Sequence, residues 1–128
     1  MNKEARAILI LVDDDTAVLS ALKFAFEVEG FEVRAYRDAE SLLGEPDFPG
    51  CGCMVLDYKL PGLNGLELLA RIRARGVELP AVLITTPTAT VRAQAAAAHV
   101  ALVEKPLLTS TLLDTVRTLL HPDASSAH

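Results

Sequence analysis

Short apolar runs alternate along the chain with amphipathic segments of about a dozen residues, a pattern typical of strand–helix units around a parallel sheet. The predicted strands are ILILV (8–12), FEVRAY (31–36), CMVLD (53–57), AVLIT (81–85) and ALVE (101–104). The first, third and fourth runs are apolar throughout, as expected of strands covered on both faces. The second run carries Glu32 and Arg34 at alternate positions, which indicates an edge strand. The pattern therefore predicts an α/β fold with a five-stranded parallel sheet.

Five helices fit the segments between and after these strands. They are predicted at 16–29, in a short stretch after Asp38, and at 64–75, 88–98 and 109–120. Asp15 and Asn64 stand where a side chain can cap the first helical turn. Gly30 and Gly76 follow helix ends, where a residue in the left-handed conformation is favoured. Each of these two helices thus has a start signal and a stop signal.

Length and composition are those of a single domain with its own core. The chain has 128 residues, of which 51% are hydrophobic, and this is enough for one sizeable core. A net charge of −5 without a cluster of Lys or Arg argues against a nucleic-acid-binding surface. The apolar runs are too short for a membrane helix, and the N-terminus lacks the pattern of a signal peptide. We therefore expect a cytoplasmic protein that contacts neither membrane nor nucleic acid.

Cysteine and histidine do not form a metal-binding pattern in this sequence. Cys51 and Cys53 lack the further ligands that structural zinc needs, and two cysteines are too few for a disulfide framework. His99, His121 and His128 lie at a helix end and in the tail, with no signature of a phosphohistidine relay. We expect free cysteines and surface histidines.

Polar residues lie at the carboxyl ends of four of the predicted strands. The carboxyl ends of parallel strands lie along one edge of the sheet, where ligands bind in folds of this class. Asp13 and Asp14 come directly after the first strand, and Asp57 ends the third. Thr85 ends the fourth strand, and Lys105 follows the fifth. These five side chains are therefore expected to converge on one edge.

Three neighbouring carboxylates need a cation, because each pair repels by about 4 kcal/mol at about 4 Å and an effective dielectric of about 20. Oxygen ligands without histidine or cysteine select a hard ion such as Mg²⁺. Such a site leaves coordination positions for water and a phosphoryl oxygen, and Lys105 and the Thr85 hydroxyl can bind the remaining oxygens. The residues thus predict a phosphoryl-transfer site with Asp57 as the nucleophile.

With these residues placed, the chain from about Ile8 to Leu120 resembles the receiver domain of two-component response regulators. The matching segments are VDDD (12–15), LDYKLPGLNG (56–65), LIT (83–85) and EKP (104–106). The resemblance implies a flavodoxin-like, doubly wound sheet of strand order 2-1-3-4-5 with five helices. It implies a receiver domain over residues 1–121, with a tail or the start of a linker over residues 122–128.

The resemblance also implies a phosphoacceptor regulator rather than an enzyme acting on other substrates. Asp57 would accept a phosphoryl group from the phosphohistidine of a sensor histidine kinase. Lys105 and Thr85 would bind the phosphoryl oxygens. Phosphorylation would then switch the surface of the fourth helix and fifth strand to control an output domain or a partner.

A ligand set for Mg²⁺ follows from the same resemblance. Asp14, Asp57 and the backbone carbonyl of Lys59 would ligate the ion directly, and Asp13 would hold it through water. In this family the proline after the site lysine is usually preceded by a cis peptide, so Pro106 is the expected position.

The predicted fourth helix is unusual in its small side chains. Val91, Ala95 and Ala98 share one helical face, which we expect to pack on the sheet. Receiver domains similar to this chain often pair through the fourth helix and fifth strand. The small residues on the outer face leave a flat surface, so a phosphorylation-dependent homodimer is an expectation of the resemblance.

Three positions depart from the common receiver pattern. Thr86, followed by Pro87, stands where the family usually has Ala or Gly, and we expect the two to crowd access to the phosphoryl group and alter its turnover. Leu102 stands where the family often has Tyr or Phe. We therefore expect the signal to pass through Thr85, the loop 86–90 and the facing helix.

Two alternatives remain open at this point. A haloacid dehalogenase-like phosphohydrolase would use Asp13 as the nucleophile, with Lys105 and Thr85 in support. Ala17 stands where that family has Thr or Val, and no acidic pair follows the lysine. The other alternative is a receiver-like interaction module that works without phosphorylation. A nucleotide-binding domain is weaker, because aspartates replace the glycine-rich phosphate cradle.

Overall fold

The computed structural model describes residues 7–86, 88–105 and 109–121. Strands and helices alternate through this part of the chain. They are β1 (Ile8–Val12), α1 (Thr16–Val28), β2 (Glu32–Tyr36), α2 (Ala39–Leu43), β3 (Gly52–Asp57), α3 (Gly65–Ala74), β4 (Ala81–Thr85), α4 (Ala89–Ala97), β5 (Ala101–Glu104) and α5 (Thr109–Leu120). All predicted elements are confirmed, and their bounds differ from the predictions by at most one residue.

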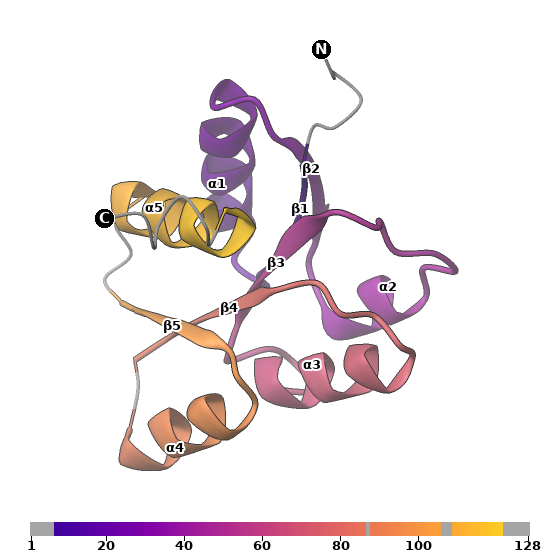
Figure 1. Ribbon diagram of the computed structural model, residues 1–128, viewed down its shortest axis with the longest axis vertical. Coiled ribbons are helices and arrows are strands. Elements are labelled where there is room, and N and C mark those ends of the chain that lie inside the picture. Colours follow the sequence, from indigo (N-terminus) through magenta and orange to yellow (C-terminus); the bar gives the residue numbers. More distant parts are fainter. Residues whose placement is uncertain (1–6, 87, 106–108, 122–128) are drawn as a thin grey trace.

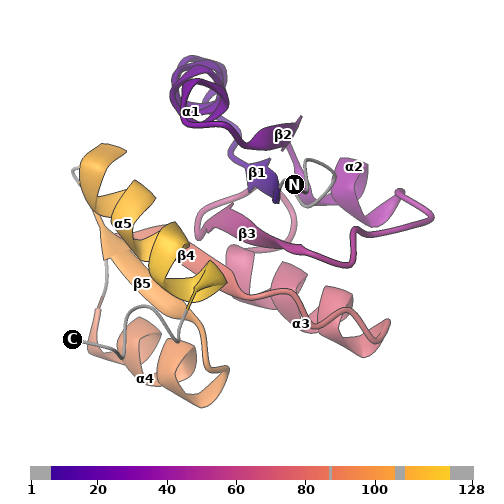
Figure 2. The same cartoon turned by 45° about the horizontal axis from the view of Figure 1, so that its top comes forward.

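The five strands form one parallel sheet of order β2-β1-β3-β4-β5. Figures 1 and 2 show the three layers: α1 and α5 cover one face of the sheet, and α2, α3 and α4 cover the other. This is the doubly wound order that the receiver resemblance implies. The order reverses between β1 and β3, so a ligand site is expected at the carboxyl ends of these two strands.

The core has two parts, one on each face of the sheet. Along β1, Leu9 and Leu11 pack against α1 and α5, whereas Ile10 and Val12 pack against the helices on the other face. Successive strand residues point to opposite faces, so a strand covered on both sides must be apolar throughout. β2 is only half-buried and lies at the sheet edge, which confirms the interpretation of its alternating pattern.

The predicted helix caps are present. The Asp15 carboxylate accepts two backbone N–H groups of the first turn of α1. Asn64 and Glu67 form a capping box at the start of α3, with bonds of 2.8 and 2.9 Å. Gly30 and Gly76 have φ angles of +99° and +87°, which is the left-handed region that glycine adopts readily. Local sequence signals therefore determine where these helices begin and end.

The apolar face predicted for α4 packs on the sheet as expected. Val91 and Ala95 are buried, and Ala98 is half-buried against the same core. In the described part of the chain, no helix is long and apolar enough to cross a membrane.

The cysteines and histidines also agree with the predictions. Cys51 and Cys53 are both free, the first exposed and the second buried. His99 and His121 are exposed. Four predictions concern residues outside the described ranges and stay predictions: those for Pro87, Pro106, His128 and the segment 122–128.

Candidate functional site

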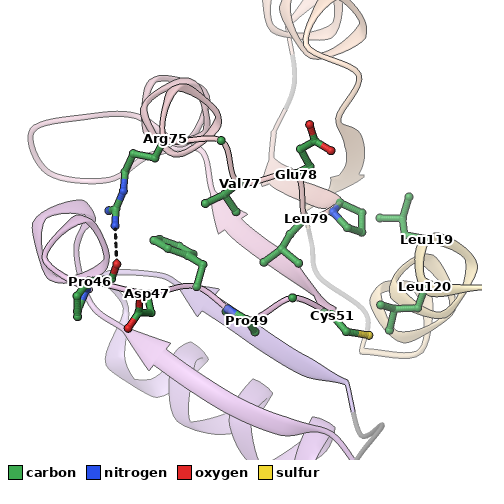
Figure 3. Close-up of a pocket in the computed structure, with 15 residues that line it drawn as sticks. Pro46, Asp47, Pro49, Cys51, Arg75, Val77, Glu78, Leu79, Leu119 and Leu120 are labelled. Atoms are coloured by element: carbon green, nitrogen blue, oxygen red, sulfur yellow. Dashed lines mark hydrogen bonds between the residues drawn. The ribbon is translucent and has the colours of Figure 1, made fainter.

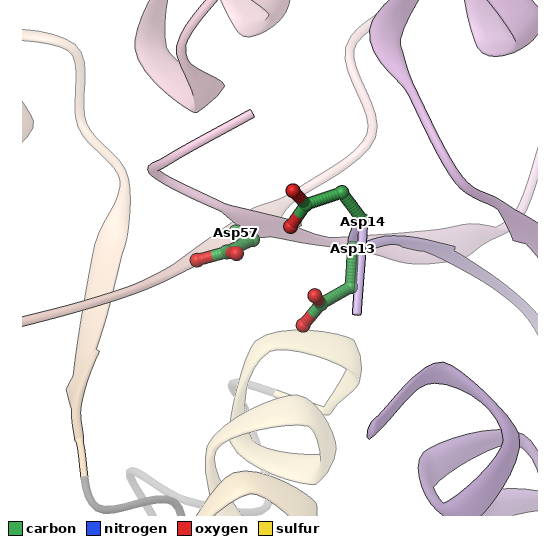
Figure 4. A group of neighbouring side chains, drawn as sticks. All are labelled: Asp13, Asp14 and Asp57. Atoms are coloured by element: carbon green, nitrogen blue, oxygen red, sulfur yellow. The ribbon is translucent and has the colours of Figure 1, made fainter. Parts of the chain in front are cut away.

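Three carboxylates meet at the carboxyl edge of the sheet. Asp13, Asp14 and Asp57 each offer one oxygen, and these oxygens all lie within 4.8 Å of one another (Figure 4). The parallel register pairs Val12 of β1 with Leu56 of β3. The residues that follow, Asp13 and Asp57, therefore leave the sheet side by side. The predicted convergence of these three acids is thus present in the fold.

The three acids differ in burial, and this sets their electrostatics. Asp57 is 4% exposed and Asp13 is 6% exposed, whereas Asp14 is exposed. Burial raises the pKa of Asp57 above its usual value; nearby Lys105 opposes this rise, and the charge of Asp14 adds to it. Burial also raises the pKa of Asp13, against the effect of a 2.9 Å hydrogen bond from the backbone N–H of Asp15. Negative charge is therefore costly here without a cation.

Lys105 supplies one cation to the cluster. Its Nζ lies 3.4 Å from Oδ1 of Asp57, while its side chain is 43% exposed. Its backbone N–H donates to the carbonyl of Thr85 at 3.0 Å, which ties the end of β5 to β4. Apart from the ion pair, Oδ1 of Asp57 makes no hydrogen bond to the described residues, although it is buried. A buried oxygen that accepts no hydrogen bond is a candidate to bind a further group, such as a metal ion.

These groups line a cavity of about 420 Å³ at the sheet edge. The lining residues are Asp13, Asp14, Asp15, Val18, Asp57, Lys59, Ile84 and Lys105. The cavity thus gathers all the predicted site residues except Thr85. Thr85 is buried at the end of β4, and this described lining does not include it. Val18 and Ile84, which form an apolar wall, were not predicted, because nothing in their sequence context separates them from other core residues.

Gly65 lets the loop after β3 fold closely against the nucleophile. Its N–H donates to the carbonyl of Tyr58 at 2.8 Å. A Cβ at this position would lie 2.6 Å from the carbonyl oxygen of Asp57 and 2.7 Å from Cδ1 of Leu83. Only glycine fits this approach without movement of the backbone. α3 therefore starts directly behind the acidic cluster.

The donor set fits a hard divalent cation. The cluster offers only oxygen ligands from the three acids, and one of these oxygens is buried without a hydrogen bond. Mg²⁺ prefers a few carboxylate oxygens and keeps open positions for water and phosphate oxygens. Lys59, whose carbonyl the receiver resemblance adds to the ligand set, lines the same cavity.

A family model described as the response regulator receiver domain matches residues 9–117. The chain belongs to this family. The receiver domain is 35% identical over 77 residues to the transcriptional regulatory protein FixJ of Bradyrhizobium diazoefficiens, covering 60% of this chain and 38% of FixJ. It is 30% identical over 124 residues to the response regulator protein TmoT of Ectopseudomonas mendocina, covering 94% of this chain and 55% of TmoT. The receiver domain thus corresponds to about half or less of these relatives.

Solved structures resemble the receiver domain over nearly its whole length. A CheY-like response regulator receiver domain protein from Methanospirillum hungatei is 27% identical, with a TM-score of 0.83 over 94% of this chain and 98% of that one. The response regulator StyR is 29% identical, with a TM-score of 0.78 over 96% of this chain and 63% of StyR. Family membership and strand order together favour the receiver over the phosphohydrolase alternative.

Proposed function

We propose that the receiver domain accepts a phosphoryl group on Asp57 in a Mg²⁺-dependent reaction. The observation that carries this proposal is the buried Oδ1 of Asp57, which faces Lys105 across 3.4 Å and has no hydrogen bond to the described residues. Burial raises the pKa of Asp57 against the opposing effect of Lys105, so the carboxylate is more basic, and therefore more nucleophilic, than an ordinary exposed one. Its oxygen attacks phosphorus, the bond from phosphorus to the donor breaks, and an acyl phosphate forms.

The surrounding residues take separate roles in this reaction. Asp14, Asp57 and the carbonyl of Lys59 would hold Mg²⁺, with Asp13 through water, and the ion would supply positive charge next to the phosphoryl oxygens. Lys105 exchanges its contact with the carboxylate for a phosphoryl oxygen, which its half-exposed side chain is free to do. The hydroxyl of Thr85 binds a further oxygen.

The phosphodonor that we propose is the phosphohistidine of a sensor histidine kinase. The relatives named above are regulatory proteins, and the receiver domain spans less than two thirds of each. We therefore propose that it controls an output domain or partner, that it does so in the cytoplasm, and that it catalyses only its own phosphorylation and dephosphorylation. Residues 1–121 are the receiver in this proposal, and residues 122–128 are a tail or the start of a linker.

The output surface in this proposal lies on α4 and β5. Arg92 of α4 and Glu104 of β5 form an exposed ion pair of 2.6 Å, and Glu104 directly precedes Lys105. Leu102 is half-buried against the core beneath α4, where it packs as an aliphatic side chain. Movement of Thr85 toward the phosphoryl group would shift the loop 86–90 and α4. A phosphorylation-dependent homodimer through this surface is part of the proposal.

Intact-mass measurement with acetyl phosphate and Mg²⁺ tests the proposal. We expect the wild-type chain to gain one phosphoryl group, about 80 Da. Asp57→Asn should gain nothing, and Asp13→Asn should gain less because the ion is held less well. Asp47→Asn, the same change in an exposed residue at the opposite edge of the sheet, is the matched control.

Two results would contradict phosphorylation of Asp57. A folded wild-type chain that binds Mg²⁺ but gains no mass would indicate the phosphorylation-independent interaction module. Release of phosphate that depends on Asp13 rather than Asp57 would indicate a phosphohydrolase.

A further inference from the structure

Asp15 connects the acidic site to the start of α1. It directly follows Asp14 and is the N-cap residue of the helix. Its Oδ1 accepts the backbone N–H groups of Ala17 at 3.0 Å and Val18 at 3.2 Å. Its carbonyl accepts the N–H of Leu19 at 2.9 Å. Side chain and main chain of Asp15 are therefore both bound to the first turn of α1.

The backbone N–H of Asp15 binds the acidic cluster rather than the helix. It donates to Oδ1 of Asp13 at 2.9 Å, and the Asp13 side chain is 6% exposed. A carboxylate that accepts a fixed N–H has fewer orientations open to it than one in solvent. Because α1 holds Asp15 in place, the start of the helix restrains the orientation of the Asp13 carboxylate through this N–H.

Asp15 does not join the three acids as an equal member. It lines the same cavity, but among the described residues the carboxylates whose oxygens lie within 4.8 Å of one another are those of Asp13, Asp14 and Asp57. Oδ1 of Asp15 is already bound to two N–H groups of α1, where an anion is also favoured by the helix dipole. The contacts of Asp15 therefore favour an action through Asp13 over direct binding of a metal ion.

We propose that Asp15 is a positioning residue for Mg²⁺. Its hydrogen bonds to α1 hold its N–H against Asp13, and this fixes the Asp13 carboxylate in the orientation that the ion requires. The inference rests on the metal site of the proposed function. Groups that orient a metal-binding residue through a hydrogen bond commonly contribute about 10- to 100-fold to affinity. In this role the capping oxygen of Asp15 matters, and its charge does not.

Calorimetric titration with Mg²⁺ alone separates the capping oxygen of Asp15 from its charge. Asp15→Asn keeps an oxygen that caps a helix as well as Asp does, whereas Asp15→Ala removes it. We expect the Kd for Mg²⁺ to rise about tenfold in Asp15→Ala. Asp15→Asn should raise it by less than about threefold, because Asp15 is exposed and salt screens its charge. The titration contains no phosphodonor, so its result does not depend on phosphorylation of Asp57.

Two further alanine variants are controls. Asp38 caps α2 by accepting the N–H of Ser41 at 2.7 Å, so Asp38→Ala removes a cap of the same kind. Asp47 lines a larger cleft of about 680 Å³, formed by the segments 46–52 and 75–80 and the end of α5 at the opposite edge of the sheet (Figure 3). It lies between α2 and β3, so Asp47→Ala removes a charge without a cap. Both controls should keep the Kd of the wild type.

Hydrogen exchange of the residue 15 amide, measured by NMR without metal, tests the route through Asp13. The N–H that binds Asp13 should exchange at the same rate in the wild type and Asp15→Asn. In Asp15→Ala it should exchange about tenfold faster, because the hydrogen bond then opens more often. A cap that only stabilised α1 would leave this exchange rate unchanged.

Four results would overturn the role of Asp15. The first is a wild-type Kd in an Asp15→Ala chain that is folded by circular dichroism. The second is an Asp15→Asn chain as weak as Asp15→Ala, which would assign the effect to charge. The third is equal weakening by Asp38→Ala, which would assign it to lost helix stability. The fourth is weaker binding without faster amide exchange. A wild-type chain that binds no Mg²⁺ would contradict the metal site itself and the role of Asp15 with it.

Discussion

Nζ of Lys105 lies 3.4 Å from Oδ1 of Asp57, although the two residues belong to the ends of strands that are not neighbours in the sheet. β4 separates β3 from β5, and the carbonyl of Thr85 at its end accepts the N–H of Lys105. The contact joins a buried anion to a half-exposed cation. It therefore keeps a positive charge beside the nucleophile.

Replacing Lys105 with methionine should slow phosphorylation without unfolding the domain. The ammonium stabilises charge on the phosphoryl oxygens, and its loss is expected to lower the rate with acetyl phosphate by about 10- to 100-fold. Lys105→Arg, which keeps the charge, should retain more of the rate. The measurement is the rate constant from intact mass against time. Lys23→Met, a change on α1 and remote from the site, is the control and should leave the rate unchanged. A rate for Lys105→Met equal to that of the wild type would contradict the proposed role of Lys105.

Neutralising Asp13 should stabilise the metal-free fold near neutral pH. Burial raises the pKa of Asp13 in the fold above its ordinary value of 3.8. Such a group contributes stability that is fully present below the unfolded pKa and is lost as the pH rises through the folded pKa. Asp13→Asn removes this loss, so its free energy of unfolding in urea with EDTA should exceed that of the wild type at pH 7. The difference should shrink toward pH 4; a constant difference would contradict this cause.

Saturating Mg²⁺ should make the wild type more stable than Asp13→Asn, the reverse of the order expected without metal. At a hundredfold excess over its Kd, a ligand that binds only the folded state adds about 2.7 kcal/mol to the free energy of unfolding. We expect this gain for the wild type and a smaller one for Asp13→Asn, because the variant offers one carboxylate fewer. Thermal melting of each chain during titration with Mg²⁺ in calcium-free buffer measures the gain in stability of the wild type and of Asp13→Asn. Equal stabilisation of the two chains by Mg²⁺ would show that Asp13 does not take part in metal binding.

Gly65→Ala should displace the backbone of Asp57 and destabilise the domain. The added Cβ would lie 2.6 Å from the carbonyl oxygen of Asp57, so either strand or helix must shift, at a cost of about 1–3 kcal/mol. Gly50→Ala is the matched control, because a Cβ there meets nothing within 4 Å. Urea unfolding and the phosphorylation rate are measured together. Equal effects of the two substitutions would show that the close approach is unimportant.

Thr86→Ala should shorten the lifetime of the phosphorylated domain several-fold. Thr86 is exposed directly after Thr85, at the carboxyl edge of the sheet. A smaller side chain there is expected to give water easier access to the acyl phosphate. Loss of the phosphoryl mass after removal of acetyl phosphate gives the lifetime. Thr118→Ala, the same change in an exposed residue of α5, should have no effect.

The fold was largely predictable because its signals are local. Fully apolar runs identified β1, β3 and β4, and the caps at Asp15 and Asn64 located the starts of α1 and α3 within one residue. Strand order is different, because the register between distant strands depends on long-range packing. It was predicted only from the resemblance to receiver domains, which the structure and the family match confirm.

The sequence by itself determined which acids meet, because Asp13, Asp14 and Asp57 follow strands whose carboxyl ends share one edge. Only the tertiary structure decided that Asp13 and Asp57 are buried while Asp14 is exposed. The approach of Gly65 to Asp57 and the cleft beside the end of α5 also arise from contacts between segments far apart in the chain. Local pattern determines a side chain's element and position, whereas burial depends on which other elements pack over it.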